Sequence, residues 1–186
     1  MNKKEIRSSI LTTMKKHSNT EKDIADDWLA NQFFKSQSYQ EATSIGIVLS
    51  LPHEVNTYKI IQQSLIDHKK IFVPEVDYKS KIMTFKQLLD LNEIERDEKG
   101  IYHSISNTDT SNQLDLVVVP GVGFKSDGYR IGYGGGFYDR FLSKFKPNTI
   151  SLLYDFQLID FKPDEHDQPV DELIIYNGHK WRQKWT

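Results

Sequence analysis

Cysteine is absent from the 186 residues of the chain. Its absence excludes disulfides, thiolate nucleophiles, and zinc or iron–sulfur sites that depend on cysteine ligands. The sequence also lacks any apolar run that approaches the roughly 20 residues of a membrane-spanning helix. Met1 to Arg7 is followed by hydroxyl side chains rather than by the apolar segment of a secretory signal. We therefore expect a cytoplasmic protein that does not contact membranes.

Neither sign of charge is in large excess. The formal net charge is -2, with 38% hydrophobic and 27% charged residues, a composition typical of soluble globular proteins. Such a balance gives no general attraction for nucleic acid. The length predicts a single domain over residues 1–186. Its basic tail, residues 177–186, carries Trp181 and Trp185, and is interpreted either as a partner site or as a poorly ordered or locally packed terminus.

Hydrophobic periodicity predicts helices that alternate with strands. The predicted helices span residues 2–17, 20–36, 55–68 and 136–145, and the predicted strands span 45–49, 71–73, 81–85, 114–119, 149–154 and 170–176. Pro74 is expected to end the second strand, and the polar segment 92–112 is interpreted as irregular. Alternation of this kind is typical of a mostly parallel sheet. The predicted fold is a Rossmann-like, three-layer α/β/α domain.

The second predicted helix has its own start signal. Thr20 and Asp23 have the spacing of a capping box. Ile24, Trp28 and Phe33 follow at intervals that could place them on one buried face.

The most informative segment is a glycine-rich block, defined as residues 120–142, that follows the apolar strand 114–119. It contains seven of the ten glycines of the chain. Fixing glycines costs backbone entropy. The close approach of backbone N–H groups to an anion such as phosphate can offset that cost. The block matches neither the P-loop pattern nor the dinucleotide-binding fingerprint. A tight turn and a phosphate cradle are both compatible with the glycines alone.

Residues around these glycines favour phosphate and a cation. Arg130 offers a planar fork for phosphate oxygens, and Asp139 lies early in the following helix. Magnesium usually takes one or two protein carboxylates, with water and substrate phosphates completing its ligands. Asp167, in a turn before the last strand, is a second candidate and Asp171 a weaker third, although aspartates in turns often satisfy backbone N–H groups. The histidines, His53 included, lack the spacing of a zinc site.

Two further sets of charged residues lie outside the glycine-rich block. Lys3 and Arg7 continue the helical stripe of Ile10 and Met14. They either extend into solvent from the end of a buried face or clamp a phosphate chain at the lip of a cleft. Glu54 follows the first strand, so it is expected at the same sheet edge as the glycine-rich block, although it could also stabilise the dipole of the next helix.

Together these residues resemble the 5-formyltetrahydrofolate cyclo-ligases, also called 5,10-methenyltetrahydrofolate synthetases. The segments that carry the resemblance are the pair Lys3 and Arg7, residues 49–57 ending in Glu-Val-Asn-Thr, residues 72–74, the glycine-rich block and residues 167–171. The resemblance covers most of the chain. In many relatives a tyrosine stands in place of Phe137, and in some a lysine stands in place of Gly135.

The resemblance implies conversion of 5-formyltetrahydrofolate, with ATP and Mg²⁺, into 5,10-methenyltetrahydrofolate, ADP and phosphate. It implies that ATP is bound by Lys3, Arg7, Arg130, Ile131, Gly132, Tyr133, Gly134, Gly135, Gly136, Phe137 and Tyr138. The implied folate-binding residues are Leu49, Glu54, Tyr133, Gly134, Gly135, Gly136 and Phe137. The implied catalytic residues are Arg130, Tyr133 and Asp139, and the implied magnesium ligands are Asp139 and Asp167. The folate could be polyglutamylated, and the protein is expected to be a monomer or a weak dimer.

Two other functions remain open. Similar α/β folds serve sugar-phosphate isomerases and acyl-CoA transferases, for which Glu54 is the available base or nucleophile. A non-catalytic folate- or nucleotide-binding protein is the other alternative. The presence of Arg130, Asp139 and Asp167 argues against it, because pure binding does not need this set of charges.

Overall fold

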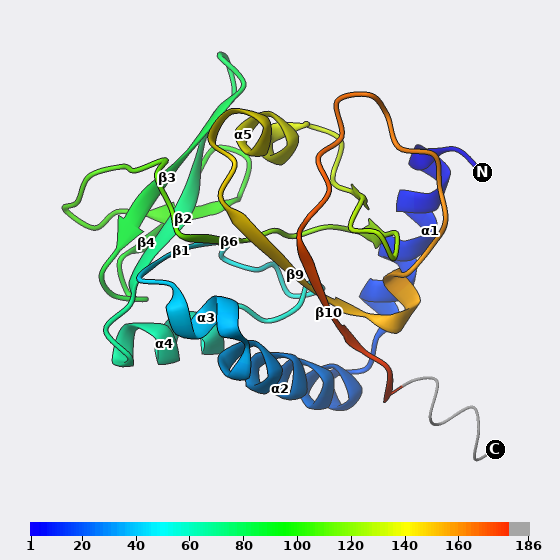
Figure 1. Cartoon of the computed structure of the whole chain (residues 1–186), viewed down its shortest axis with the longest axis horizontal. Coiled ribbons are helices and arrows are strands. Elements are labelled where there is room, and N and C mark those ends of the chain that lie inside the picture. Colours follow the sequence, from blue (N-terminus) through cyan, green and yellow to red (C-terminus); the bar gives the residue numbers. More distant parts are fainter. Residues whose placement is uncertain (179–186) are drawn as a thin grey trace.

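The computed structural model describes residues 1–178, and its centre is a six-stranded sheet in the order β10-β9-β6-β1-β2-β3 (Figure 1). These strands are β1 (Ser44–Ile47), β2 (Lys70–Asp77), β3 (Ile82–Leu88), β6 (Leu116–Val118), β9 (Asn148–Tyr154) and β10 (Glu172–Tyr176). Every neighbouring pair is parallel except β2 and β3. Two smaller sheets pair β4 (Ile94–Arg96) with β5 (Tyr102–Ser104), and β7 (Gly123–Phe124) with β8 (Arg130–Ile131). The prediction of a mostly parallel sheet is confirmed.

Helices cover both faces of this sheet (Figure 1). They are α1 (Lys3–Lys16), α2 (Asn19–Lys35), α3 (Gln37–Glu41), α4 (Tyr58–Ile66) and α5 (Phe137–Phe145), with a short 3-10 helix, η1 (Asp155–Gln157). α2, α3 and α4 bury their apolar side chains with the sheet in one large cluster, and α5 packs in a second cluster on the opposite side. The three-layer α/β/α prediction is therefore confirmed.

α1 belongs to a third apolar cluster that joins it to the glycine-rich block. Asn2 caps the helix by accepting a hydrogen bond from the Glu5 backbone N–H at 2.8 Å. The buried stripe of Ile6, Ile10 and Met14 packs with residues of the glycine-rich block, Val122 and Ile131. This docking fixes the position of the first turn of α1, which carries the two cations.

The start of α2 differs from the prediction. Ser18 is the N-cap, and its side chain accepts a hydrogen bond from the Glu21 backbone N–H at 3.3 Å. Thr20 already lies inside the helix, so the capping box predicted from Thr20 and Asp23 is wrong. The hydroxyl two residues earlier takes the cap because α2 begins at Asn19, one residue before the predicted start.

The buried face of α2 also differs in part from the prediction. Ala25, Leu29 and Phe33 face the sheet at intervals of four residues. Ile24 and Trp28 are 49% and 39% exposed, so of the three side chains predicted to share a face only Phe33 is buried. The methyl side chain of Ala25 lets the helix approach the sheet closely, which moves the larger neighbours to the margin.

Pro74 does not end β2. β1 pairs with β2 only as far as the Gly46–Phe72 position, whereas β3 continues alongside and places Phe85 opposite Pro74. Proline cannot donate to a strand ladder, but beyond Phe72 the β1 side of β2 requires no donor. The strand therefore continues through Pro74 to Asp77.

The segment predicted to be irregular contains the hairpin formed by β4 and β5. Asp97 holds its turn, because its carboxylate accepts hydrogen bonds from the backbone N–H groups of Lys99 and Ile101 at 2.9 and 3.0 Å. The strands are three residues long and largely polar, too short for an alternating pattern to be recognised.

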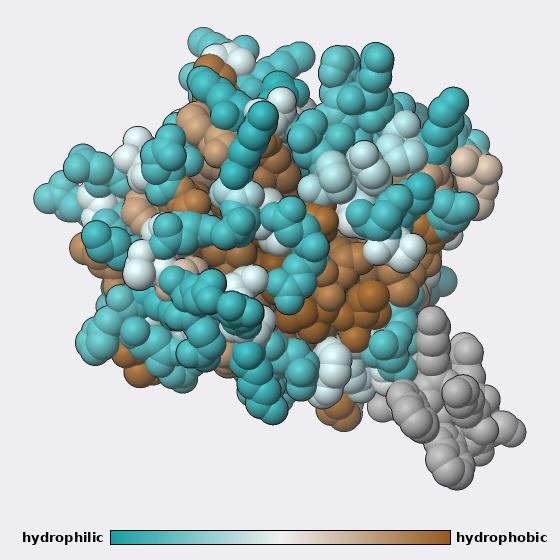
Figure 2. All heavy atoms as spheres, in the orientation of Figure 1, coloured by the Kyte–Doolittle hydropathy of each residue, from teal (hydrophilic) through white to brown (hydrophobic). Residues whose placement is uncertain are grey.

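Residues 55–57, predicted to begin the third helix, belong instead to the loop before α4. The backbone N–H and hydroxyl of Thr57 exchange hydrogen bonds with Ser50, and α4 begins at Tyr58. Within residues 1–178, no helix is long and apolar enough to cross a membrane. The face shown in Figure 2 is mostly hydrophilic, with apolar side chains gathered around β10, the edge strand of the sheet. The tail tryptophans, Trp181 and Trp185, lie outside the described residues.

Candidate active site

A cavity of about 860 Å³ lies where α1, the glycine-rich block and the loop after β1 meet. β1 and β6 are parallel neighbours in register at Ile47 and Val118, so the loops at their carboxyl ends meet at the same sheet edge. The residues that the resemblance assigns to ATP, folate or metal all line this cavity: Lys3, Arg7, Leu49, Glu54, Arg130, Ile131, Gly132, Tyr133, Gly134, Gly135, Gly136, Phe137, Tyr138, Asp139 and Asp167. Asp171, the weaker third magnesium candidate, does not line it; its carboxylate accepts hydrogen bonds from the backbone N–H and hydroxyl of Thr149.

The two cations of α1 are held at the cavity by specific partners. Lys3 Nζ donates to Asp164 Oδ2 at 2.8 Å and to Asp167 Oδ2 at 2.6 Å. Burial lowers the pKa of Lys3, but the hydrogen bonds and charges of both aspartates outweigh burial and raise the pKa above its ordinary value. Arg7 Nε donates to the Gly132 carbonyl at 2.7 Å. The cations thus join α1 to the cavity wall rather than extending freely into solvent.

The glycine-rich block turns tightly at two residues that need glycine. Gly134 has φ of 104° and Gly136 has φ of 69°, in the left-handed region that other residues rarely adopt. Gly136 is also the N-cap of α5 and supplies no capping side chain. The turn lies beside α1, since a Cβ atom on Gly134 would be 3.7 Å from the Arg7 guanidinium carbon.

Arg130 is the most deeply buried cation of the cavity. Its side chain is 5% exposed, and Nη2 lies 4.0 Å from Asp139 Oδ1. Burial lowers the pKa of Arg130 while Asp139 raises it, and an arginine retains its charge under either influence.

Two buried donors of the cavity have no hydrogen-bond partner within residues 1–178. They are Arg130 Nε and the hydroxyl of Tyr138. Buried polar atoms are nearly always hydrogen-bonded, so such donors are suited to a ligand that supplies acceptors. A phosphate chain would supply oxygens to both.

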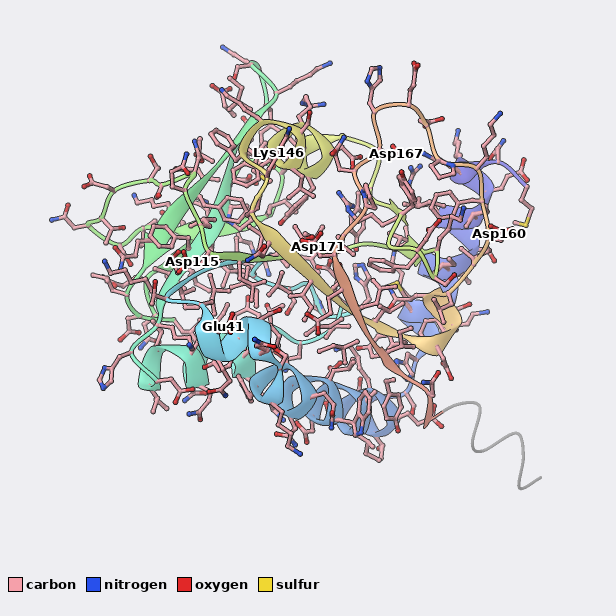
Figure 3. All side chains as sticks on the ribbon, viewed as in Figure 1. Glu41, Asp115, Lys146, Asp160, Asp167 and Asp171 are labelled. Carbon is pink, nitrogen blue, oxygen red and sulfur yellow. The ribbon has the colours of Figure 1, made fainter. Side chains whose placement is uncertain are left out.

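The candidate magnesium ligands lie at the same end of the cavity. Asp139 is in the first turn of α5, and its Oδ1 accepts a hydrogen bond from the Gln168 backbone N–H at 3.1 Å. Gln168 directly follows Asp167, which lies on the loop before β10; in the view of Figure 3 this residue is seen between α5 and α1.

Within the described part of the chain, no group of three or more histidine or acidic side chains could hold a metal ion. Two carboxylates suit magnesium, which takes its other ligands from phosphates and water. The donor set therefore fits Mg²⁺ accompanied by a phosphate ligand better than it fits a metal held by the protein alone.

The opposite wall of the cavity is built around Glu54, which is 8% exposed. Glu54 Oε1 accepts a hydrogen bond from the Leu51 backbone N–H at 2.7 Å. Glu54 Oε2 accepts one from the Tyr133 hydroxyl at 3.2 Å. Glu54 lies four residues before Tyr58, the first residue of α4, so it does not serve as a first-turn charge for that helix.

Tyr133 links this wall to the glycine-rich block. Its hydroxyl also lies 2.9 Å from His53 Nε2. Burial of the hydroxyl, together with the charge and hydrogen bond of Glu54, raises the pKa of Tyr133. From the sequence, His53 was considered only as a zinc ligand. The position of His53 next to Glu54 is the signal that could have placed it at the cavity.

Tyr78, Asp97 and His103 are among the other cavity residues that were missed from the sequence. The Tyr78 hydroxyl donates to Asp97 Oδ2 at 2.6 Å, and burial together with Asp97 raises the pKa of Tyr78 to about 12. His103 Nδ1 is buried with no hydrogen-bond partner in residues 1–178. Tyr78 meets the Phe137 ring edge-on, with ring centroids 6.4 Å apart. No local pattern marks these residues, because their places depend on the unpredicted hairpin and on the full length of β2.

A parallel α/β sheet with buried anion-binding donors at its carboxyl edge defines an α/β enzyme that acts on anionic ligands. Comparison with known proteins identifies the family to which the chain belongs. The model of the 5-formyltetrahydrofolate cyclo-ligase family matches residues 1–176. The chain belongs to this family of ligases and is an enzyme.

Individual relatives agree with this membership. The 5-formyltetrahydrofolate cyclo-ligase of Mus musculus is 32% identical over 161 residues, which cover 78% of this chain and 79% of the relative. A solved 5,10-methenyltetrahydrofolate synthetase from Mycoplasma pneumoniae is 26% identical with a TM-score of 0.73, and the match covers 94% of this chain and 98% of that one. The synthetase structure from Aquifex aeolicus has a TM-score of 0.82 at 24% identity, covers 94% and 90% of the two chains, and supports the fold.

Proposed function

We propose that the chain converts 5-formyltetrahydrofolate into 5,10-methenyltetrahydrofolate, with ATP and Mg²⁺, and releases ADP and phosphate. Family membership supports the overall reaction. The observation that carries the ATP-dependent form is the buried, unpartnered Nε of Arg130 in the same cavity as Glu54. The end of the cavity that holds Arg130 suits phosphate. The opposite wall, around Glu54, suits an uncharged ring that is rich in hydrogen-bond donors.

The ligands divide the cavity between them. Lys3, Arg7 and residues 130–138 bind ATP, and Leu49, Glu54 and residues 133–137 bind the folate. The glycine-rich block is shared by both sets, so the two ligands meet there. Asp139 and Asp167 would hold the magnesium ion, which, when bound, neutralises charge on the phosphate chain.

The chemistry requires a better leaving group than the formyl oxygen of the substrate. Transfer of the terminal phosphoryl group of ATP to that oxygen forms a new O–P bond and releases ADP. N10 then attacks the formyl carbon, the C–O bond breaks, and phosphate departs with the proton that N10 loses, which leaves the five-membered methenyl ring.

The protein contributes position and electrostatics to these steps. Arg130 stabilises negative charge on the transferred group, and its burial makes this interaction stronger than it would be in water. Arg7 and the glycine-rich block hold the phosphate chain in line with the formyl oxygen. Tyr133 and Glu54 orient the folate.

The contacts of Glu54 favour this function over an isomerase or transferase. Hydrogen bonds to a carboxylate weaken it as a nucleophile, but they leave it able to accept a further hydrogen bond from a ligand. Both oxygens of Glu54 accept hydrogen bonds, from Leu51 and from Tyr133. We infer that Glu54 recognises the substrate rather than attacking it.

Absorbance of methenyltetrahydrofolate, formed from 5-formyltetrahydrofolate by the purified full chain, tests the proposal. Product is expected when ATP and Mg²⁺ are both present and is expected to be absent when either is omitted. Folded protein that forms no product would refute the activity, and product formed without ATP would refute the mechanism. The expectations of a cytoplasmic location, a monomer or weak dimer, and a folate that could carry a polyglutamate tail remain part of the proposal.

A further inference from the structure

The hydroxyl of Tyr133 lies between two partners on the loop after β1. It donates to Glu54 Oε2 at 3.2 Å, and it lies 2.9 Å from His53 Nε2. A hydroxyl has one proton, so it can donate to only one of these partners at a time. While it donates to Glu54, its oxygen can accept from His53 Nε2–H; in the other His53 tautomer, Nε2 can instead accept the hydroxyl proton's hydrogen bond.

A carboxylate oxygen can accept two hydrogen bonds, but a substrate donor on Glu54 Oε2 would share that oxygen with Tyr133, whose contact is already long at 3.2 Å. Glu54 Oε1 is already engaged by the backbone N–H of Leu51, which leaves Oε2 for a ligand. A folate that donates to Glu54 Oε2 would compete with the Tyr133 hydroxyl. Tyr133 is 49% exposed, so without another protein acceptor its hydroxyl would turn to water, and the side chain would lose its anchor on this wall when the substrate binds.

His53 lies in the right place to be that second acceptor, and its side chain is neutral. The side chain is partly buried, and burial lowers its pKa; Glu54 opposes this shift, whereas Lys15 and Lys22 add to it. A lowered pKa keeps the imidazole neutral at neutral pH, and a neutral imidazole with its proton on Nδ1 can accept a hydrogen bond at Nε2. The rings meet at 69° with centroids 6.3 Å apart, so Tyr133 reaches His53 through its hydroxyl and not by ring stacking.

We propose that His53 is a positioning residue that takes over the Tyr133 hydroxyl when Glu54 binds the folate. In this arrangement Tyr133 stays in place across the cavity while Glu54 Oε2 becomes available. The glycine-rich block, which carries Tyr133, keeps its position for the phosphate chain. This inference rests on the proposed folate substrate.

A double-mutant cycle with His53→Ala and Tyr133→Phe tests the inference through binding. The dissociation constants of 5-formyltetrahydrofolate and of ATP are measured separately by calorimetry on the full chain, with no turnover. His53→Ala is expected to weaken folate binding about three- to tenfold, the range of one hydrogen bond, and to leave ATP binding unchanged. In the Tyr133→Phe background the same substitution is expected to change folate binding less than about twofold, because no hydroxyl remains to be held.

Two further variants complete the test. His53→Gln retains an acceptor and is expected to recover part of the folate affinity. His68→Asn alters an exposed histidine with φ of 62°, a conformation that asparagine tolerates, and is expected to leave both affinities unchanged. Circular dichroism confirms that each variant is folded.

The outcomes separate the inference from the function on which it rests. If the unmodified chain binds no 5-formyltetrahydrofolate, the proposed function fails and the inference falls with it. If that chain binds the folate but His53→Ala has no effect, or has an equal effect with and without the Tyr133 hydroxyl, the inference alone is wrong.

Discussion

At the scale of single residues, the charges of the cavity are paired with one another. Lys3 contacts Asp164 and Asp167, and Arg130 faces Asp139 at 4.0 Å. At 4 Å the attraction between unit charges is about 4 kcal/mol at an effective dielectric constant of about 20, against about 1 kcal/mol in bulk water. Burial thus makes the Arg130–Asp139 pair more significant than the exposed contact of Lys3 with Asp164.

Asp139→Asn tests the assignment of the metal. The substitution keeps the size of the side chain but removes one of two carboxylates, so turnover is expected to fall by about 100-fold. The magnesium concentration at half-maximal activity should rise. Asp160→Asn is the matched control, because the side chain of Asp160 is 96% exposed and does not line the cavity. An Asp139→Asn titration curve that matches the unmodified chain would contradict the role of Asp139 in metal binding.

At the scale of elements, α1 carries cavity residues on a helix that is docked elsewhere. Ile6, Ile10 and Met14 attach it to the apolar cluster, while Arg7 reaches the Gly132 carbonyl from the same helix. The apolar stripe stabilises the docking of α1, and the hydrogen bond from Arg7 to Gly132 orients the helix at the cavity. Removing the cation should therefore affect the ligand more than the fold.

Arg7→Ala is expected to weaken ATP binding about tenfold, in line with the loss of a charged hydrogen bond. Folate affinity should be largely kept, since the Glu54 wall is untouched. Calorimetric titration with each ligand provides the measurement. Lys4→Ala, an exposed cation of the same helix, is the control. An equal loss of both affinities would show that α1 had shifted and that Arg7 has a structural role.

The cap of α2 gives a stability test that does not depend on function. Ser18→Ala removes the acceptor for the Glu21 backbone N–H and is expected to lower the free energy of unfolding by about 1 kcal/mol. Thr20→Ala, inside the helix, should change it by less than about 0.5 kcal/mol. Urea denaturation followed by circular dichroism measures both. A larger effect at Thr20 than at Ser18 would overturn the cap assignment.

Sequence reasoning recovered the elements whose own residues determine them. α1, α5 and the parallel strands follow from periodicity and from apolar runs, and their predicted positions differ from the structure by few residues. Pro74 and the hairpin of β4 and β5 could not be predicted, because both depend on which strand lies alongside. Pro74 is tolerated where β2 no longer pairs with β1, and the hairpin is made of short polar strands.

The same distinction applies to the candidate site. The residues predicted to share it do line one cavity, and the roles assigned to them remain predictions. His53, Tyr78 and His103 were missed because their places depend on contacts between distant segments. Tyr133, for example, reaches Glu54 across 79 positions of sequence. No local sequence pattern can indicate a contact between residues so far apart in the chain.

At the scale of the whole molecule, the cavity collects segments from both ends of the chain onto one rigid sheet. α1 supplies cations, the loops after β1 and β6 supply the facing walls, and the loop before β10 supplies Asp167 (Figure 3). This arrangement supports the central claim that ATP and the formyl group of the folate meet in one cavity. Phosphoryl transfer between them then requires no large movement of the sheet.

The most direct test of that claim follows the formyl oxygen. 5-Formyltetrahydrofolate labelled with ¹⁸O in its formyl group is converted by the full chain in unlabelled water with ATP and Mg²⁺, and the released phosphate is analysed by mass spectrometry. The account predicts that each methenyl product is matched by one phosphate that carries the label. Unlabelled phosphate, formed at the same rate as the methenyl product, would contradict phosphorylation of the formyl oxygen.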